Sequence, residues 1–260
     1  TLEVIDMQFK FGVEIEFFGV NYQTVINTLR NKNINVKDFS GYNHAVVPQW
    51  KITTACSVNS NGTGLGKGLE LVSPILYGEE GLDELEIVLN TIKALGAKVD
   101  KTCGVHVHHD VSEFSLQDFK SLFCLYSYYQ PVINSFMPKS RRDGQYCHTI
   151  SRSELNDIMN ANSIEDLKWA TGSRYRVLNF QSYVKYGTIE FRQHSGSVEF
   201  EKIEAWILLT HFMLERAYRE PFEYTQEVTR SFSKFCDEFN IDGHYIESYL
   251  KHRIEVLNVA

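Results

Sequence analysis

The chain has 260 residues, of which 43% are hydrophobic and 23% are charged, and this composition is typical of a globular protein. Its formal net charge of -7 argues against a general nucleic-acid binder and against a protein of acidic membrane surfaces, because both classes need a basic surface. The five cysteines contain no C-x-x-C pair, and no signal peptide or membrane-spanning run is recognisable, so we expect reduced thiols in a cytoplasmic protein.

The hydrophobic pattern predicts strands and helices in an order that lacks strict strand–helix alternation. The predicted strands cover residues 9–17, 49–56, 69–74, 103–111, 175–182 and 187–194, and the last two form a hairpin across VKYG. The predicted helices cover residues 22–30, 81–95, 115–129, pieces of 151–170, 199–217 and 244–257. Ser115 and Asp118 are spaced like a capping box, and residues 59–68 (NSNGTGLGKG) are a predicted loop.

This order of elements argues against a doubly wound parallel sheet, which needs repeated βαβ units. We predict an α+β fold with a curved, mostly antiparallel sheet and with helices on its apolar, convex face. No linker or repeat interrupts the chain, so we predict one catalytic domain over residues 1–260.

The first strand carries two glutamates on one face. Side chains in a strand alternate between its two faces, so Phe9, Phe11, Val13, Ile15 and Phe17 form an apolar face. Glu14 and Glu16 then stand side by side on the opposite face. Like charges at this spacing repel each other unless a positive charge lies between them.

Three other strands also place acids, imidazoles or a guanidinium opposite their apolar residues. These residues are Glu70 in LELVSP; His106, His108 and Asp110 in GVHVHHD; and Glu190, Arg192 and His194 in GTIEFRQH. A solvated face of an antiparallel sheet would explain a mixture of Lys, Thr, Ser and Glu. The central positions of these four strands contain no Lys, which favours a concave functional site.

Clustered carboxylates need a cation, and the chemistry of this set indicates Mg²⁺, with Mn²⁺ as the alternative because of the added imidazoles. Arg192 on the same face suits a phosphoryl group in transfer. The residues therefore indicate a metal–nucleotide site. No G-x-x-x-x-G-K-[ST] or G-x-G-x-x-G loop occurs, so the sheet itself would have to hold the nucleotide.

Five segments resemble, in order and spacing, the amidoligase family of carboxylate–amine ligases, which is related to glutamine synthetase and glutamate–cysteine ligase. The segments are FGVEIEF, GLELVSP, CGVHVHHD, RYRVLNF and GTIEFRQHSG, and the resemblance runs from Phe9 to Trp206. It implies a curved antiparallel sheet that binds ATP and Mg²⁺ on its concave face. It also implies ATP-dependent amide formation through an acyl phosphate, with release of ADP and phosphate.

The resemblance also implies roles for individual residues. Arg192, His194 and Glu190 would be catalytic, and the cofactor-binding residues would be His108, Arg192 and Asn179. His194 and Ser195 would line the acceptor end. The implied metal ligands are Glu14, Glu16, Glu70, His106 and Glu190. Shared divalent cations would then hold Glu14 and Glu16 together.

One departure from the family pattern follows the WKITT strand. An Asp is expected there, and this chain has Ala55-Cys56-Ser57. This keeps open a non-catalytic nucleotide-binding module on the same scaffold. A metal-dependent amidohydrolase is the other alternative, because His-x-His on a strand also binds zinc, although that fold needs eight βα units.

The partners expected for the ligase are small-molecule or peptide carboxylates and amines. Their identity is left open by the sequence, as is the oligomeric state. No membrane partner and no general nucleic-acid partner is expected. Residues 31–48 and 136–172 carry turn residues with little periodicity, so we expect substrate specificity to lie there.

Overall fold

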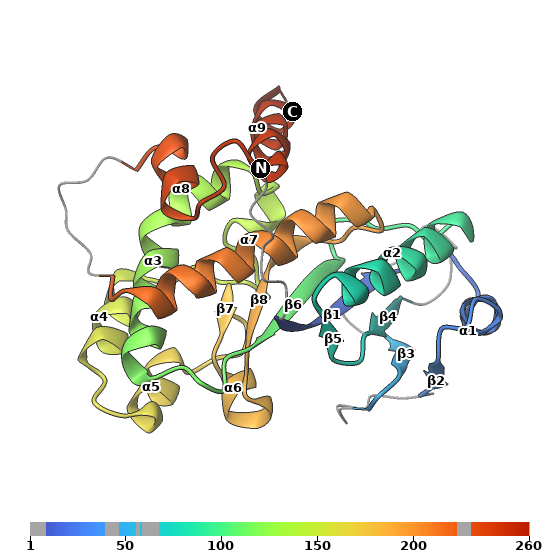
Figure 1. Cartoon of the computed structure of the whole chain (residues 1–260), viewed down its shortest axis with the longest axis horizontal. Helices are drawn as coiled ribbons and strands as arrows, with labels where there is room; N and C mark the ends of the chain where they lie inside the picture. Colours follow the sequence, from blue (N-terminus) through green and yellow to red (C-terminus); the bar gives the residue numbers. More distant parts are fainter. Residues whose placement is uncertain (1–8, 40–46, 56–57, 59–67, 223–229, 260) are drawn as a thin grey trace. The chain divides into compact units, whose positions relative to one another are not determined.

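The computed structural model describes residues 9–39, 47–55, 58, 68–222 and 230–259. Within these ranges the fold is α+β, as predicted, with eight strands and nine α-helices (Figure 1). The strands are β1 (Lys10–Phe17), β2 (Val36–Asp38), β3 (Trp50–Thr54), β4 (Leu69–Val72), β5 (Leu76–Tyr77), β6 (Gly104–Asp110), β7 (Leu178–Asn179) and β8 (Thr188–Ser195). The helices are α1 (Tyr22–Asn31), α2 (Gly78–Ala94), α3 (Leu116–Ser135), the 3-10 helix η1 (Lys139–Arg141), α4 (Arg152–Asn160), α5 (Ile164–Thr171), α6 (Gln181–Tyr186), α7 (Phe200–Arg219), α8 (Phe232–Glu238) and α9 (Tyr245–Val259).

The strands form an open sheet in the order β2-β3-β4-β1-β6-β8-β7, and β5 pairs with β1. The sheet is mostly antiparallel, as predicted, but β2 and β3 run parallel, so it is mixed. A mostly antiparallel open sheet is not the closed parallel barrel of a metal-dependent amidohydrolase. None of the described helices is long and apolar enough to cross a membrane.

The chain divides into two compact units, which are described separately. Unit 1 comprises Thr1–His109 and His194–Glu204, and unit 2 comprises Asp110–Gln193 and Ala205–Ala260. The single catalytic domain stays a prediction. Each unit contains a backbone hydrogen bond between residues that flank β6 and β8. Gly196 N–H donates to Cys103 O at 2.9 Å in unit 1, and Val111 N–H donates to Gly187 O at 3.0 Å in unit 2.

The core of unit 1 is built on the apolar face of β1. Phe11, Val13, Ile15 and Phe17 are all buried, as their alternation in the sequence predicts. Helix α2 packs against β5 and presents Gly81 at the contact. A Cβ atom at Gly81 would lie 2.8 Å from Leu76 Cβ and 3.2 Å from the Phe11 ring. Gly81 therefore lets α2 approach the strands closely, which fixes the position of β1 and its opposite, polar face.

Unit 2 has an aromatic core around α3, which packs against α4, while α4 packs against α5 (Figure 1). Phe119 makes edge-on contacts with Phe180 and Tyr183 at ring-centroid distances of 4.9 Å and 4.8 Å. The predicted capping box starts α3, with Ser115 and Asp118 exchanging hydrogen bonds. The core also buries Gln193 of β8, whose Oε1 accepts from Tyr126 Oη–H at 2.7 Å.

The predicted strand at 175–182 is reduced to β7, and the predicted hairpin turn across VKYG is wrong. Only β7 is a strand there, and α6 occupies the remainder up to Gly187. Gly187 has φ 71°, and its N–H donates to Tyr183 O, so it ends a helix and makes no hairpin turn. Packing of Tyr183 on Phe119 and Phe180 stabilises this short helix. The antiparallel pairing of β7 with β8 is nevertheless present.

The remaining elements follow the predictions with shifted ends. Helix α2 begins at Gly78, three residues before the predicted Gly81, and α3 continues through Pro131 to Ser135. The short elements β2, β5, η1 and α8 were not predicted, because none contains enough residues to show a hydrophobic period. The predicted loop at 59–68 lies outside the described residues except for Gly68.

Candidate functional site

The strand register of unit 1 places five predicted site residues on one face of the sheet. Glu14 of β1 lies directly opposite His106 of β6, and His108 follows two residues further along β6. On the other side of β1, Glu16 lies directly opposite Glu70 of β4. Residues directly opposite each other across a strand pair share a face. The sequence pattern therefore predicted this polar face, while the metal and phosphate roles of its residues stay predictions.

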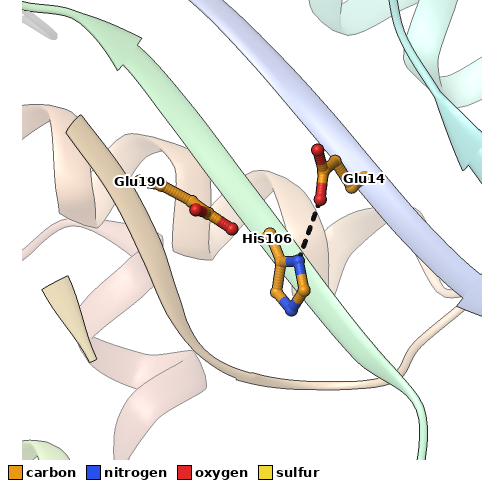
Figure 2. A group of neighbouring side chains, drawn as sticks. All are labelled: Glu14, His106 and Glu190. Carbon is orange, nitrogen blue, oxygen red and sulfur yellow. Dashed lines mark hydrogen bonds and ion pairs between the residues drawn. The ribbon is translucent and has the colours of Figure 1, made fainter. Parts of the chain in front are cut away.

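Glu14 is the centre of an acid–imidazole cluster, and Figure 2 shows it pointing toward His106. Its Oε2 lies 3.0 Å from Nδ1 of His106, and its Oε1 lies 3.5 Å from Nε2 of His108. Burial alone would raise the pKa of Glu14. The hydrogen bonds and charges of His106 and His108 outweigh that effect and hold the pKa well below its usual value. Glu14 is therefore a carboxylate at neutral pH.

Glu16 is the more buried carboxylate of the polar face. Its Oε2 accepts a hydrogen bond of 2.6 Å from the Gly104 N–H at the start of β6. Its side chain stands opposite that of Glu70, so two acids face each other across β1 and β4. Like charges in directly opposite positions destabilise a strand pair. Two carboxylates in opposite positions are suited to sharing a bound cation.

Strand β3 extends the same face and adds residues that the sequence pattern did not identify. Thr53 lies directly opposite Glu70, and Lys51 lies opposite Val72, which itself lies opposite Glu14. Lys51 and Thr53 are both buried. The strand itself was predicted. Lys51 and Thr53 were not counted among the candidate site residues, because the sequence does not show that β3 pairs with β4.

The face becomes apolar beyond Thr53. This is the position at which the family pattern has an Asp and this chain has Ala55. Ala55 is buried in a cluster with Phe18, Val58 and Cys103. Its N–H donates to Gly68 O at 2.9 Å, which continues the pairing of β3 with β4. An ionised Asp at this position would lie among apolar side chains. The absence of an acid at position 55 is therefore consistent with its surroundings in this chain.

Unit 2 contains a second group of predicted residues, on β7 and β8. Glu190 lies directly opposite Asn179 and is buried. Its Oε2 accepts from Asn179 Nδ2–H, and its Oε1 pairs with the Arg192 guanidinium. The Arg192 Nε–H also donates to the Tyr146 carbonyl at 3.2 Å. Asn179 is thus in direct contact with the predicted metal ligand Glu190, and its predicted contact with a nucleotide or substrate stays a prediction.

His194 lies in unit 1 at the end of β8 and is also buried. Its Nδ1 lies 2.7 Å from the Ser195 carbonyl oxygen. A carbonyl oxygen only accepts, so Nδ1 carries a proton. In the neutral ring, Nε2 is then the nitrogen that can accept a proton. The predicted catalytic role of His194 requires such an acceptor.

A family model described as putative amidoligase enzyme matches residues 7–214. Because this match covers well over half of the chain, the protein belongs to that family, in agreement with the resemblance found in the five motifs. No curated protein matches the chain.

Proposed function

We propose that the protein is an ATP- and Mg²⁺-dependent carboxylate–amine ligase that forms an amide bond through an acyl phosphate. Membership of the amidoligase family supports the ligase class. The observation that carries the proposal is the polar face of unit 1. There a strand pair sets Glu16 against Glu70, and Glu14 contacts two histidines.

The donor atoms of the chain fit a hard divalent cation. Carboxylate oxygens with an added imidazole suit Mg²⁺ or Mn²⁺. The proposed ligands are Glu14, Glu16, Glu70, His106 and Glu190. Glu14, His106 and Glu190 each offer one ligand atom, and Figure 2 draws these three side chains. The bound cation would supply neutralisation of the phosphate charges of ATP.

Arg192 and His108 are the residues proposed to hold the phosphates. Arg192 offers a planar fork of N–H donors, which suits the oxygens of a phosphoryl group in transfer. Lys51 adds a positive charge to the same face as Glu14 and Glu70. In the proposed first step, a carboxylate oxygen of the substrate attacks the γ-phosphorus of ATP. The bond from that phosphorus to the β–γ bridging oxygen breaks, which leaves ADP and an acyl phosphate.

His194 is proposed to act in the second step. The uncharged amine attacks the acyl carbon, the C–O bond to phosphate breaks, and phosphate leaves. The amine nitrogen loses one proton, and Nε2 of His194 can accept it because Nδ1 already donates to the Ser195 carbonyl. On the described strands that carry this chemistry, the polar residues of the candidate site are Glu, His, Arg, Lys, Thr and Asn, and no Ser or Cys paired with a base is identified there. We therefore propose no covalent enzyme intermediate.

Trapping with hydroxylamine tests this proposal. The protein is incubated with ATP, Mg²⁺, hydroxylamine and a panel of amino acids, peptides and other carboxylates, and the products are identified by mass spectrometry. We expect a hydroxamate, ADP and phosphate in equal amounts. Glu190→Gln, which removes a proposed metal ligand, is the matched control. Formation of AMP and pyrophosphate, or a labelled protein, would contradict the mechanism.

A non-catalytic nucleotide-binding module is the second candidate, and one observation favours it. Ala55 packs in an apolar cluster where the family pattern has an acid. If that acid takes part in catalysis in the relatives, this chain binds the nucleotide without turnover. Binding of Mg²⁺–ATP without release of ADP across the whole carboxylate panel would support this candidate.

A further inference from the structure

Three backbone segments of unit 2 lie side by side at Arg192. The Arg192 N–H donates to Val177 O, and the Val177 N–H donates to His148 O, both at 2.9 Å. The His148 N–H in turn donates to Tyr175 O at 2.8 Å. Hydrogen bonds therefore connect the middle of β8 to residues 175–177 and to residues 146–148. Residues 175–177 and 146–148 are therefore not free loops. Their backbone is hydrogen-bonded to β8 at Arg192, the residue predicted to bind phosphate.

Two exposed tyrosines stand on these segments. Tyr146 is 40% exposed and Tyr175 is 36% exposed, and their rings pack nearly perpendicular, at 5.6 Å and 70°. The Arg174 guanidinium lies 5.0 Å from the centroid of the Tyr175 ring, and its Nη2 donates to the Tyr175 hydroxyl at 3.1 Å. We name Tyr146, Tyr175 and Arg174 the aromatic platform.

The aromatic platform is directly connected to Arg192. The Arg192 Nε–H donates to the Tyr146 carbonyl at 3.2 Å, so the backbone of one platform residue holds the guanidinium. The turn that carries Tyr146 is also tightly packed. A Cβ atom at Gly144 would lie 2.6 Å from Ser140 O and 3.2 Å from Cys147 Sγ, so this turn requires glycine.

Single exposed aromatic residues are common on protein surfaces and need no explanation. Three features distinguish this pair. The two rings pack on each other, the backbone that carries them is hydrogen-bonded to β8, and one of them contacts the residue proposed to hold the transferred phosphate. Amphipathic aromatic side chains in a fixed position, with an arginine beside them, form a surface that suits a flat ring.

We propose that the aromatic platform binds a planar ring carried by the carboxylate substrate, and that Tyr146 is a specificity-determining residue. This inference rests on the proposed function. Arg192 would hold the γ-phosphate, and the reacting carboxylate must contact that same phosphate. The nucleobase of ATP is separated from it by two further phosphates and a ribose. Because the Tyr146 carbonyl accepts from Arg192, Tyr146 would then lie beside the body of the carboxylate substrate and not beside the base.

Ligand binding tests the inference in the full-length chain with Mg²⁺ and a non-hydrolysable ATP analogue. Phenylacetate and hexanoate are the probes, and their affinities are measured by NMR titration. We expect the wild-type protein to prefer phenylacetate. Tyr146→Ala should weaken phenylacetate binding about threefold to tenfold and leave hexanoate unchanged, while Tyr146→Phe should bind like wild type. Tyr218→Ala is the matched control, because Tyr218 is exposed and stacked on Phe114, which is not a residue of the platform.

Three outcomes would overturn the inference. One is a wild-type protein without preference for phenylacetate, and another is an equal loss of both probes in Tyr146→Ala. The third comes from calorimetry: if Tyr146→Ala weakens ATP but not inorganic triphosphate, the platform binds the nucleobase. Failure of the proposed function is distinguishable, because the wild-type protein would then form no hydroxamate with any carboxylate of the panel.

Discussion

The two groups of candidate residues balance their carboxylates in different ways. In unit 1, Glu14 contacts the imidazoles of His106 and His108. In unit 2, Glu190 pairs with the guanidinium of Arg192, which is charged at every working pH. A metal cation can replace the imidazole contacts of Glu14. Glu190 instead forms an ion pair with a guanidinium, which is a permanent cation.

This difference gives the two groups of candidate residues different net charges. The polar face of unit 1 has an excess of acid and is suited to binding cations. In unit 2, the Arg192 guanidinium already compensates the charge of Glu190, so Glu190 as a proposed metal ligand would share its carboxylate between Arg192 and a cation. The predictions below test this comparison.

The largest expected effect is loss of activity when a proposed metal ligand loses its charge. Glu16→Gln and Glu190→Gln should both remove hydroxamate formation, yet their thermal melts should shift in opposite directions. Glu16→Gln relieves the repulsion with Glu70 and should stabilise the fold by up to about 1 kcal/mol. Glu190→Gln leaves the Arg192 guanidinium without its carboxylate and should destabilise the fold by about 1–3 kcal/mol. If both variants unfold, the two acids are structural.

The second effect concerns the guanidinium itself. Arg192→Lys should lower the rate of hydroxamate formation by about 10²- to 10³-fold, because lysine offers a point charge in place of a planar fork. Steady-state kinetics with saturating ATP measures this loss. Arg216→Lys is the matched control, because Arg216 pairs with Glu238 at 2.6 Å elsewhere in unit 2. A rate for Arg192→Lys close to wild type would assign Arg192 a structural role.

The third effect is the dependence of ATP binding on metal. The acids of the polar face should repel a bare triphosphate, so removal of Mg²⁺ should weaken ATP binding by at least about tenfold. Calorimetric titration with ATP, in Mg²⁺ and then in EDTA, measures the difference. Equal affinity in both conditions would mean that the carboxylates of β1 and β4 do not take part in nucleotide binding.

Alternation within single strands was enough to predict the polar face. Glu14, Glu16 and His106 each lie between apolar neighbours, as Glu190 does in unit 2, and period two assigns each such residue to one side of its own strand. Pairing between strands has no such local signal. The place of Lys51 on this face depends on the contact of β3 with β4, which joins residues far apart in the chain.

The segment from 175 to 186 shows a second limit of sequence reasoning. A strand was predicted over 175–182 and a hairpin turn after it, but packing of Tyr183 against α3 makes α6 a helix. Tyr146 was likewise not singled out, because residues in turns have no periodicity. Its importance in the further inference comes from one backbone contact with Arg192.

The smallest predicted effect concerns Asp100, which shapes the turn before β6 in unit 1. Its Oδ1 accepts from the Thr102 N–H at 2.8 Å and from the Thr102 hydroxyl at 2.6 Å. Burial would raise the pKa of Asp100, but these hydrogen bonds to the carboxylate outweigh it and lower the pKa below its usual value. Asp100→Asn should destabilise the fold by about 0.5–1 kcal/mol at pH 7, because hydrogen bonds to a neutral amide are weaker.

The pH dependence of this loss identifies its cause. An acid whose pKa is lower in the folded state stabilises the fold above its unfolded pKa, and this contribution disappears as the pH falls through the folded pKa. Urea unfolding of the wild-type protein and of Asp100→Asn should therefore show a difference at pH 7 that shrinks as the pH falls below the usual range of an aspartate. Asp166→Asn is a useful control, because Asp166 makes similar hydrogen bonds at the start of α5 in unit 2 and should show the same trend without affecting the polar face. A difference for Asp100→Asn that is the same at all pH values would mean that the shape of the side chain, and not its charge, holds the turn.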